Sequence, residues 1–382
     1  DLFNNISIAS DLIIDAFEDL ILKSTDGGID VSGELSLRAG NDLKIENDLD
    51  IVGDLHLIAD SDSLAIGSVI VSSGATVNTN DHDLDIRAAD FDLQGNINVT
   101  DKEVLLLSSQ GKDIGLGDAV YDFNVSKAEL QRIVSDDLTV GDNTTGSVFV
   151  NNVETADDVN IDQLVHLRAL NSGESVVFEG VESTFNSLAV DADNGIDINE
   201  NVTTIEGNLN LNGDFNLKDT SYSKVIVATG KTIFSENDLI LESKVEGEGV
   251  LNLEAKNNLV VNHDMDVEGD LTIISDQDAL GDGDFTLLSG ALIDVENSTF
   301  ELKANDINIL GNVDVGTGDI FVGSSDDEEL FVGAYSSGTF VIDKAELGKF
   351  KGKDLHIGGE DSGPISVSGV EATDLTDISQ TL

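Results

Sequence analysis

The chain has 382 residues, of which 40% are hydrophobic, and it carries Lys+Arg 19 against Asp+Glu 75, a formal net charge of −56. The aliphatic content is high enough for a buried core and excludes a disordered chain, while the absence of Cys excludes a disulfide scaffold and a cysteine-ligated metal site. The charge excludes nucleic acid as a partner, and because no run of about 18 apolar residues is present, we expect no membrane insertion.

The first part of the chain contains short alternating segments separated by glycines. Gly33, Gly53, Gly74, Gly95 and Gly117 recur at nearly equal intervals, and most of them precede an x-apolar-x-apolar segment. Glycine suits a tight corner because it adopts positive φ without a Cβ clash. The spacing therefore predicts that these glycines form one vertical stack at a corner of a repeating structure.

Residues 95–117 contain three short segments in which apolar and polar residues alternate, which is the pattern of half-buried strands. The predicted fold is all-β: a parallel β-helix, or β-solenoid, with three short strands per rung of about 20–22 residues. An antiparallel sandwich is the alternative, but it needs hairpin turns at nearly every connection. Asp-Gly turns occur at Asp26 and Asp282, whereas most corners lack this chemistry.

Acidic residues gather at two corners of the predicted solenoid. Hard cations prefer several oxygen ligands, and aspartates at alternate loop positions supply them. The candidate metal ligands are Asp60, Asp62, Asp276, Asp278, Asp282 and Asp284. The expected ion is Ca²⁺, and the alternative is a pair of solvated acidic corners.

The net charge also has a structural cost. Carboxylates stacked one strand apart, roughly 4.8 Å, repel each other by about 1 kcal/mol even in water. Salt screening or bound divalent cations compensate for such repulsion. We therefore expect a saline or calcium-containing environment outside the cell.

The chain is internally duplicated. Residues 39–62 match residues 255–278 at an offset of 216 (255 − 39), and residues 84–99 match residues 300–315 at the same offset. The predicted organisation is a first solenoid copy over residues 1–156, a solenoid continuation without a second copy over 157–224, and a second copy over 225–382, forming one continuous rod. The first residue is Asp1 and the pattern still runs at Leu382, so we expect a segment of a longer chain or a processed product.

One motif occurs in both copies. Residues 127–150, KAELQRIVSDDLTVGDNTTGSVFV, and residues 344–367, KAELGKFKGKDLHIGGEDSGPISV, share A-E-L, then D-L-x-[VI]-G, then an alternating strand. This pattern resembles the repeats of large filamentous-haemagglutinin-type exoproteins. The resemblance implies a right-handed parallel β-helix, export to the cell surface, and a role in adhesion or matrix building.

No catalytic constellation is evident in the sequence. None of the histidines His56, His82, His263 and His356 has a histidine at the duplicated position, and His166 lies in the single-copy stretch. The leading hypothesis is therefore an extracellular structural filament or fibre segment that associates with itself, end to end or laterally, or with other surface or matrix components. The alternatives are the stalk of a glycan- or receptor-binding adhesin and a β-helical polysaccharide-active enzyme.

Overall fold

The computed structural model describes residues 6–8, 10–24, 29–217, 222–335, 337–359 and 362–381. These residues form two compact units, Asp1–Asp193 and Asn194–Leu382, which are described separately. Within the described residues, helical structure is confined to the short segments α1 (Lys127–Leu130), α2 (Lys344–Leu347) and η1 (Ala372–Leu375). The prediction of an all-β chain is confirmed.

In the first unit, strands from successive rungs pair in parallel and form columns. The first column comprises β1 (Ile6–Ile8), β4 (Ile29–Ser32), β7 (Leu49–Val52), β10 (Thr76–Asn78), β13 (Asn96–Ser108), β16 (Ile133–Val140) and β18 (Ile161–Ala169). The second comprises β2 (Leu12–Ala16), β5 (Leu35–Ala39), β8 (Leu55–Ile58), β11 (Leu84–Ala88), the later parts of β13, β16 and β18, and β21 (Leu188–Ala192). The third comprises β3 (Leu20–Leu22), β6 (Leu43–Ile45), β9 (Ser68–Val71) and β12 (Asp90–Leu93). The remaining strands are β15 (Phe123–Ser126), β14 (Ile114–Gly117), β17 (Val148–Asn151), β19 (Val176–Phe178) and β20 (Ser183–Phe185).

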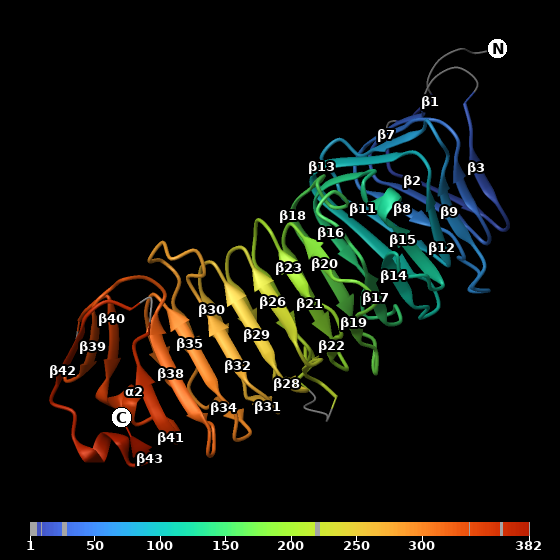
Figure 1. The fold of residues 1–382 in the computed structure, drawn as a ribbon. Helices are drawn as coiled ribbons and strands as arrows, with labels where there is room; N and C mark the ends of the chain where they lie inside the picture. Colours follow the sequence, from blue (N-terminus) through green and yellow to red (C-terminus); the bar gives the residue numbers. More distant parts are fainter. Residues whose placement is uncertain are drawn as a thin grey trace. The chain divides into compact units, whose positions relative to one another are not determined.

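The second unit repeats this arrangement, and Figure 1 shows strands β26, β29, β32, β35 and β38 of one column side by side. The first column comprises β22 (Ile196–Ile198), β25 (Val225–Val227), β28 (Val245–Gly247), β31 (Met265–Val267), β34 (Leu292–Val295), β37 (Asn312–Asp314) and β41 (Phe350–Ile357). The second comprises β23 (Val202–Thr204), β26 (Lys231–Ser235), β29 (Leu251–Ala255), β32 (Leu271–Ile274), β35 (Phe300–Ala304), β38 (Asp319–Ser324) and β43 (Ile378–Thr381), which pairs with β41. The third comprises β24 (Leu209–Asn212), β27 (Leu239–Leu241), β30 (Leu259–Val261), β33 (Phe285–Leu287) and β36 (Ile307–Ile309). The last strands are β40 (Phe340–Asp343), β39 (Leu330–Gly333) and β42 (Ile365–Ser368).

These pairings define a parallel β-helix, as predicted, with three strands in the basic rung. Val225 lies beside Val245 and Val245 beside Met265, so the residue number advances equally in these two turns (245 − 225 and 265 − 245). The next turn pairs Met265 with Ile293 and is eight residues longer (293 − 265 against 265 − 245), because a loop is inserted at one corner. Rung length therefore varies with inserted loops, whereas the parallel register is kept.

The core follows directly from the alternating pattern. In β5 the inward residues Leu35, Leu37 and Ala39 are buried, while Ser36 and Arg38 face outwards. Each inward aliphatic side chain packs on the equivalent side chain one rung away, as Leu35 does on Leu55. This continuous apolar interior is the main source of stability, because burial of each aliphatic side chain contributes about 1.5–3 kcal/mol.

The predicted single stack of glycines is wrong. Gly53 does lie directly over Gly33, where an added Cβ would come within 2.4 Å of the Gly33 carbonyl oxygen. Gly74 is not the next member, because the following rung pairs Leu55 with Leu84. The inserted loop shifts the rung, so glycines with similar spacing in the sequence occupy different corners.

The duplication also appears in the elements themselves. Every strand from β4 to β18 has a counterpart at an offset of 216 or 217 (245 − 29 for the start of β4 and 378 − 161 for the start of β18). The counterpart of β13 is divided into β37 and β38, and α1 has its counterpart in α2. The boundaries of the copies at residues 156/157 and 224/225 remain predictions. The arrangement of the chain as one continuous rod also remains a prediction.

Candidate functional site

The predicted acidic corners are two equivalent loops, which we call the first corner loop (residues 60–67) and the second corner loop (residues 276–283). The first connects β8 to β9, and the second connects β32 to β33. Each begins with an aspartate whose φ is 56°, Asp60 or Asp276, in the left-handed region of the backbone. Such a conformation costs free energy for a residue other than glycine, so it needs specific support.

The side chains of these two aspartates provide that support. Oδ1 of Asp60 accepts a hydrogen bond from the backbone N–H of Ala65 at 2.7 Å, and Oδ2 accepts one from the Ser109 hydroxyl at 2.5 Å. Asp276 is equivalent: Oδ2 accepts from the Ser325 hydroxyl at 2.5 Å. Both aspartates are buried, at 3% and 0% exposure, so their first role is to hold the loop.

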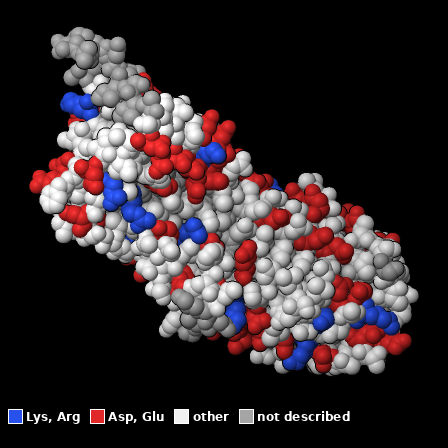
Figure 2. All heavy atoms as spheres, turned by 180° about the vertical axis from the view of Figure 1, so that it is seen from behind, with Lys and Arg blue, Asp and Glu red and all other residues white. Residues whose placement is uncertain are grey.

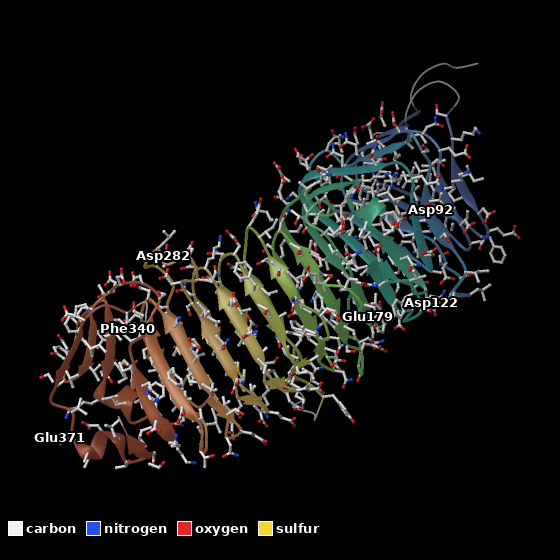
Figure 3. The ribbon with its side chains drawn as sticks, in the orientation of Figure 1. Asp92, Asp122, Glu179, Asp282, Phe340 and Glu371 are labelled. Carbon is white, nitrogen blue, oxygen red and sulfur yellow. The ribbon has the colours of Figure 1, made fainter. Side chains whose placement is uncertain are left out.

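Only three of the six predicted ligands come together. Carboxylate oxygens of Asp276, Asp278 and Asp282 lie within 4.8 Å of one another, and Asp282 projects from the ribbon in Figure 3. Asp284 is not in this group, and its Oδ1 accepts a hydrogen bond from the Asn305 side chain at 2.9 Å. Oδ1 of Asp276 already accepts hydrogen bonds from the backbone N–H groups of residues 280–282, so the exposed oxygens of the group belong to the other two aspartates.

In the first corner loop, Asp60 and Asp62 belong to no group of three potential ligands among the described residues. The position equivalent to Asp282 is occupied there by Ile66, which is 63% exposed. The two loops therefore share their architecture but differ in ligand number. Of these two loops, only the second corner loop provides three carboxylates that are close enough together to bind one cation.

A second group of potential ligands was not predicted from the sequence. Asp319 on β38 lies beside Asp354 on β41, and a carboxylate oxygen of each lies within 4.8 Å of a ring nitrogen of His356. The ammonium group of Lys353 lies 3.0 Å from Oδ1 of Asp319 and 2.9 Å from Oδ2 of Asp354. The Lys353 ammonium group therefore already provides a positive charge next to the carboxylates of Asp319 and Asp354. Asp354 and His356 lie two residues apart on β41, but no local pattern indicates the complete group, because Asp319 lies on another rung and is distant in the chain.

A groove of about 360 Å³ lies near this second group, on the outer face of β35 and β38. The Phe321 ring, 38% exposed, lines the groove and stacks on the His356 ring with the ring centres 4.5 Å apart. The Lys303 and Glu301 side chains also line the groove. An aromatic surface beside polar side chains offers both stacking and hydrogen bonding to a ligand.

Acidic side chains also form a column on the outer face of the second unit. Glu246, Asp266, Asp294 and Asp314 occupy successive rungs, and we call this column the acidic ladder. Burial, followed by the charges of Asp314 and Asp266, raises the pKa of the Asp294 carboxyl. Lys351 ends the ladder, with its ammonium 2.5 Å from Oδ2 of Asp314.

The high net negative charge predicted that carboxylates would stack one strand apart, and the acidic ladder is such a stack. Acidic side chains are spread over the face drawn in Figure 2, where basic side chains are far fewer. Because carboxylates in adjacent rungs repel one another, the ladder destabilises the fold at low ionic strength.

The histidines of the first unit pair with carboxylates on neighbouring rungs. A ring nitrogen of His56 lies 2.9 Å from Oδ2 of Asp85, and one of His166 lies 2.8 Å from Oδ2 of Asp191. No hydrogen bond joins either ring to a serine or threonine hydroxyl among the described residues, so neither pair resembles an activated nucleophile.

Among the described residues, no helix has the length and apolarity needed to cross a membrane. Comparison of the chain with protein-family models, curated proteins and solved structures found no match.

Proposed function

We propose that the chain is an extracellular structural and adhesive repeat protein, a segment of a surface filament or matrix fibre, and that it is not an enzyme. The observation that carries this proposal is the repetition of one solenoid architecture in both copies, including the corner loops held by Asp60 and Asp276. In a solenoid each rung contacts its neighbours only, so added copies extend the molecule without changing its core. The resemblance to filamentous-haemagglutinin-type repeats supports the same role.

Electron microscopy of the purified protein tests this proposal. We expect elongated particles that form longer fibres as protein concentration rises in saline buffer. Compact, isolated particles at high concentration and in the presence of calcium would contradict it. A depolymerisation assay on acidic polysaccharides, in which we expect no product, tests the proposed absence of enzymatic activity.

We also propose that Ca²⁺ binds at the second corner loop, through Asp278 and Asp282 with Asp276. Calcium is expected to raise the melting temperature of the wild-type protein, and a chelator to reverse the rise. The double variant Asp278→Asn/Asp282→Asn should show no calcium response, while Asp62→Asn at the first corner loop serves as the matched control. Identical wild-type melting curves in calcium and in chelator would refute calcium binding.

The second candidate function is the stalk of a glycan-binding adhesin. The groove beside Phe321 favours it, since an exposed ring next to Glu301 and Lys303 suits a sugar ring. A glycan-array signal that is lost in Phe321→Ala and kept in Phe234→Ala would support this role. A signal lost only when residues 157–224 are deleted would place binding in the single-copy stretch instead.

A further inference from the structure

We call the groove of about 360 Å³ on the outer face of β35 and β38 the Phe321 groove. It belongs to the second unit, where β38 has β35 on one side and β41 on the other (Figure 1). The corresponding strands of the first unit are β11, β13 and β16, and they pair in the same way. Leu107 lies beside Arg87 as Gly323 lies beside Lys303, at an offset of 216 (323 − 107). The two copies can therefore be compared position by position.

In the first unit, side chains fill the position of the groove. Leu107 is 5% exposed, and the Arg87 guanidinium lies 2.9 Å from Oδ2 of Asp142, just after β16. In the second unit, Gly323 stands in place of Leu107. Gly359 stands in place of Asp142, at an offset of 217 (359 − 142). Both glycines line the Phe321 groove, so it lies where an apolar side chain and a carboxylate of the first copy have no counterpart.

The backbone turn next to the groove is the same in both copies. Gly141 follows β16 and Gly358 follows β41, and their φ angles are 91° and 88°. The N–H of Gly141 donates to the Leu106 carbonyl at 2.9 Å, and the N–H of Gly358 donates to the Val322 carbonyl at 2.8 Å. The difference between the copies therefore lies in the side chains and not in the course of the chain.

One side of the groove is aromatic in the second copy and aliphatic in the first. Phe321 stands in place of Leu105, and His356 stands in place of Thr139. The register places Phe321 between Glu301 and His356. The His356 ring covers one face of the Phe321 ring, with the ring centres 4.5 Å apart. Phe321 is still 38% exposed and contributes apolar surface to the groove.

The polar groups of the groove carry charges of both signs. Nζ of Lys303 lies 3.7 Å from Oε1 of Glu301, and both side chains line the groove. At its edge, the Ser362 hydroxyl accepts a hydrogen bond from the N–H of Ser324 at 3.2 Å. Charges that are paired in this way offer hydrogen-bond donors and acceptors without a local net charge, which suits hydroxyl groups. The net charge of −56 in addition repels polyanions.

We propose that the Phe321 groove binds a neutral saccharide: a hexopyranose unit whose apolar C–H surface contacts Phe321 and whose hydroxyl groups bond to Glu301 and Lys303. The glycine floor allows the sugar to approach the backbone closely, because glycine has no Cβ. The volume of about 360 Å³ suits a small ligand, since such pockets measure about 300–1,000 Å³. This inference rests on the proposed adhesin-stalk role and names the ligand class of its groove.

Refilling the groove with the residues of the first copy tests the proposal. An added Cβ at Gly323 has Oγ of Ser362 as its nearest neighbour, at 3.1 Å, and one at Gly359 has no described atom within 4 Å, so both positions accept a side chain. The probes are immobilised neutral oligosaccharides of glucose, galactose, mannose and N-acetylglucosamine, beside oligosaccharides of galacturonic acid.

We expect the full wild-type chain to bind neutral members of this panel. Gly323→Leu should weaken that binding at least tenfold, and the double variant Gly323→Leu/Gly359→Asp should abolish it. Asn308→Leu, which adds the same side chain at an exposed position of β36, is the matched control and should bind like the wild type. Phe321→Ala adds no bulk, so it serves as a second variant that should lose the same signal, and circular dichroism confirms that each variant is folded.

The possible failures are distinguishable. A neutral-sugar signal that Gly323→Leu and Phe321→Ala retain in full would overturn the groove as the site and leave the stalk role in place. A wild-type signal confined to galacturonic acid oligosaccharides would overturn the neutral ligand class. Folded wild-type protein that binds no member of the panel would overturn both the groove and the stalk role.

Discussion

At the scale of single residues, the acidic side chains are of two kinds. Asp276 is buried and accepts hydrogen bonds from three backbone N–H groups and one hydroxyl, whereas Asp278 is exposed two residues later. The first carboxylate supports a loop with positive φ, and the second contributes mainly charge. The sequence pattern D-x-D does not distinguish them, because the distinction depends on which side chain turns into the fold.

The first prediction concerns the buried anchor. Asp276→Ala leaves backbone N–H groups and the Ser325 hydroxyl without their acceptor, so it should lower the free energy of unfolding by about 3 kcal/mol. Asp278→Ala, measured like Asp276→Ala in the presence of chelator, is the control and should change it by less than about 0.5 kcal/mol. Urea denaturation measures both values, and equal effects of the two substitutions would refute the anchoring role.

The second prediction concerns Glu346, which caps α2. Its carboxylate accepts hydrogen bonds from the backbone N–H groups of Asp343 and Ile309, and burial, ahead of the charges of Asp343 and Asp306, raises its pKa from the ordinary value of 4.5 to about 7. A carboxyl whose folded pKa is raised favours folding most below pH 4.5 and loses that contribution as pH rises through 7. Stability measured by denaturation from pH 4.5 to 8 should therefore fall less steeply in Glu346→Gln than in the wild type.

The control for this titration is Glu268→Gln on an exposed corner, which should leave the wild-type pH dependence unchanged. A Glu346→Gln profile that runs parallel to the wild-type profile would exclude a role of Glu346 in the pH response.

At the scale of elements, aspartates and asparagines connect successive rungs. The side chain of Asp42 accepts a hydrogen bond from the N–H of Ser68 at 2.9 Å, and the Asp19 side chain accepts one from the N–H of Asp42 at 3.3 Å. In the second unit, Asp238 and Asn258 make the equivalent connection at 3.1 Å. Part of the acidic excess therefore satisfies backbone N–H groups at the corners, and the acidic ladder represents another part, in which carboxylates face each other.

The third prediction concerns the acidic ladder. Asp294 lies between Asp266 and Asp314, so Asp294→Asn removes two repulsive contacts and should raise stability by roughly 1 kcal/mol at 10 mM salt. The gain should shrink at 0.5 M salt because the repulsion is then screened. Melting curves of the wild type, Asp294→Asn and the exposed control Asp264→Asn at both salt concentrations provide the test, and a gain that does not depend on salt would contradict the electrostatic explanation.

At the scale of the whole molecule, stability is a sum of rungs and their contacts with neighbouring rungs. Each unit has its own continuous core of Val, Leu, Ile and Phe, and the described pairings within a unit are all between rungs next to each other. Damage to one rung is therefore expected to spread to nearby rungs and no further, unlike in a globular domain with one shared core.

The fourth prediction uses this locality. Leu106 is 0% exposed on β13, and Leu106→Ala should cost about 2–5 kcal/mol through lost burial and the cavity that remains. Hydrogen exchange should accelerate in the adjacent strands β11 and β16 and stay at its wild-type rate in β33 and β36 of the second unit. Equal acceleration in both units would show that the chain unfolds as one cooperative body.

The sequence alone determined the fold class. Period-two alternation and a duplication at an offset of 216 (255 − 39) are local, repeated signals, and they led to a parallel β-helix with three strands per rung. They did not determine the register of the rungs. The inserted first corner loop lengthens one turn, so the glycines Gly53 and Gly74 occupy different corners despite their regular spacing.

Only the tertiary structure decided what each polar residue does. It buried Asp60 and Asp276, aligned the acidic ladder, and brought Asp319 beside His356, because these relations depend on which rungs pair between distant parts of the chain. It also exposed Ile365 and Val367 while burying their counterparts Val148 and Val150. Two closely similar strands differ there because β19 pairs with β17, whereas among the described residues β39 is the strand that pairs with β42, and no local pattern in the sequence records that difference.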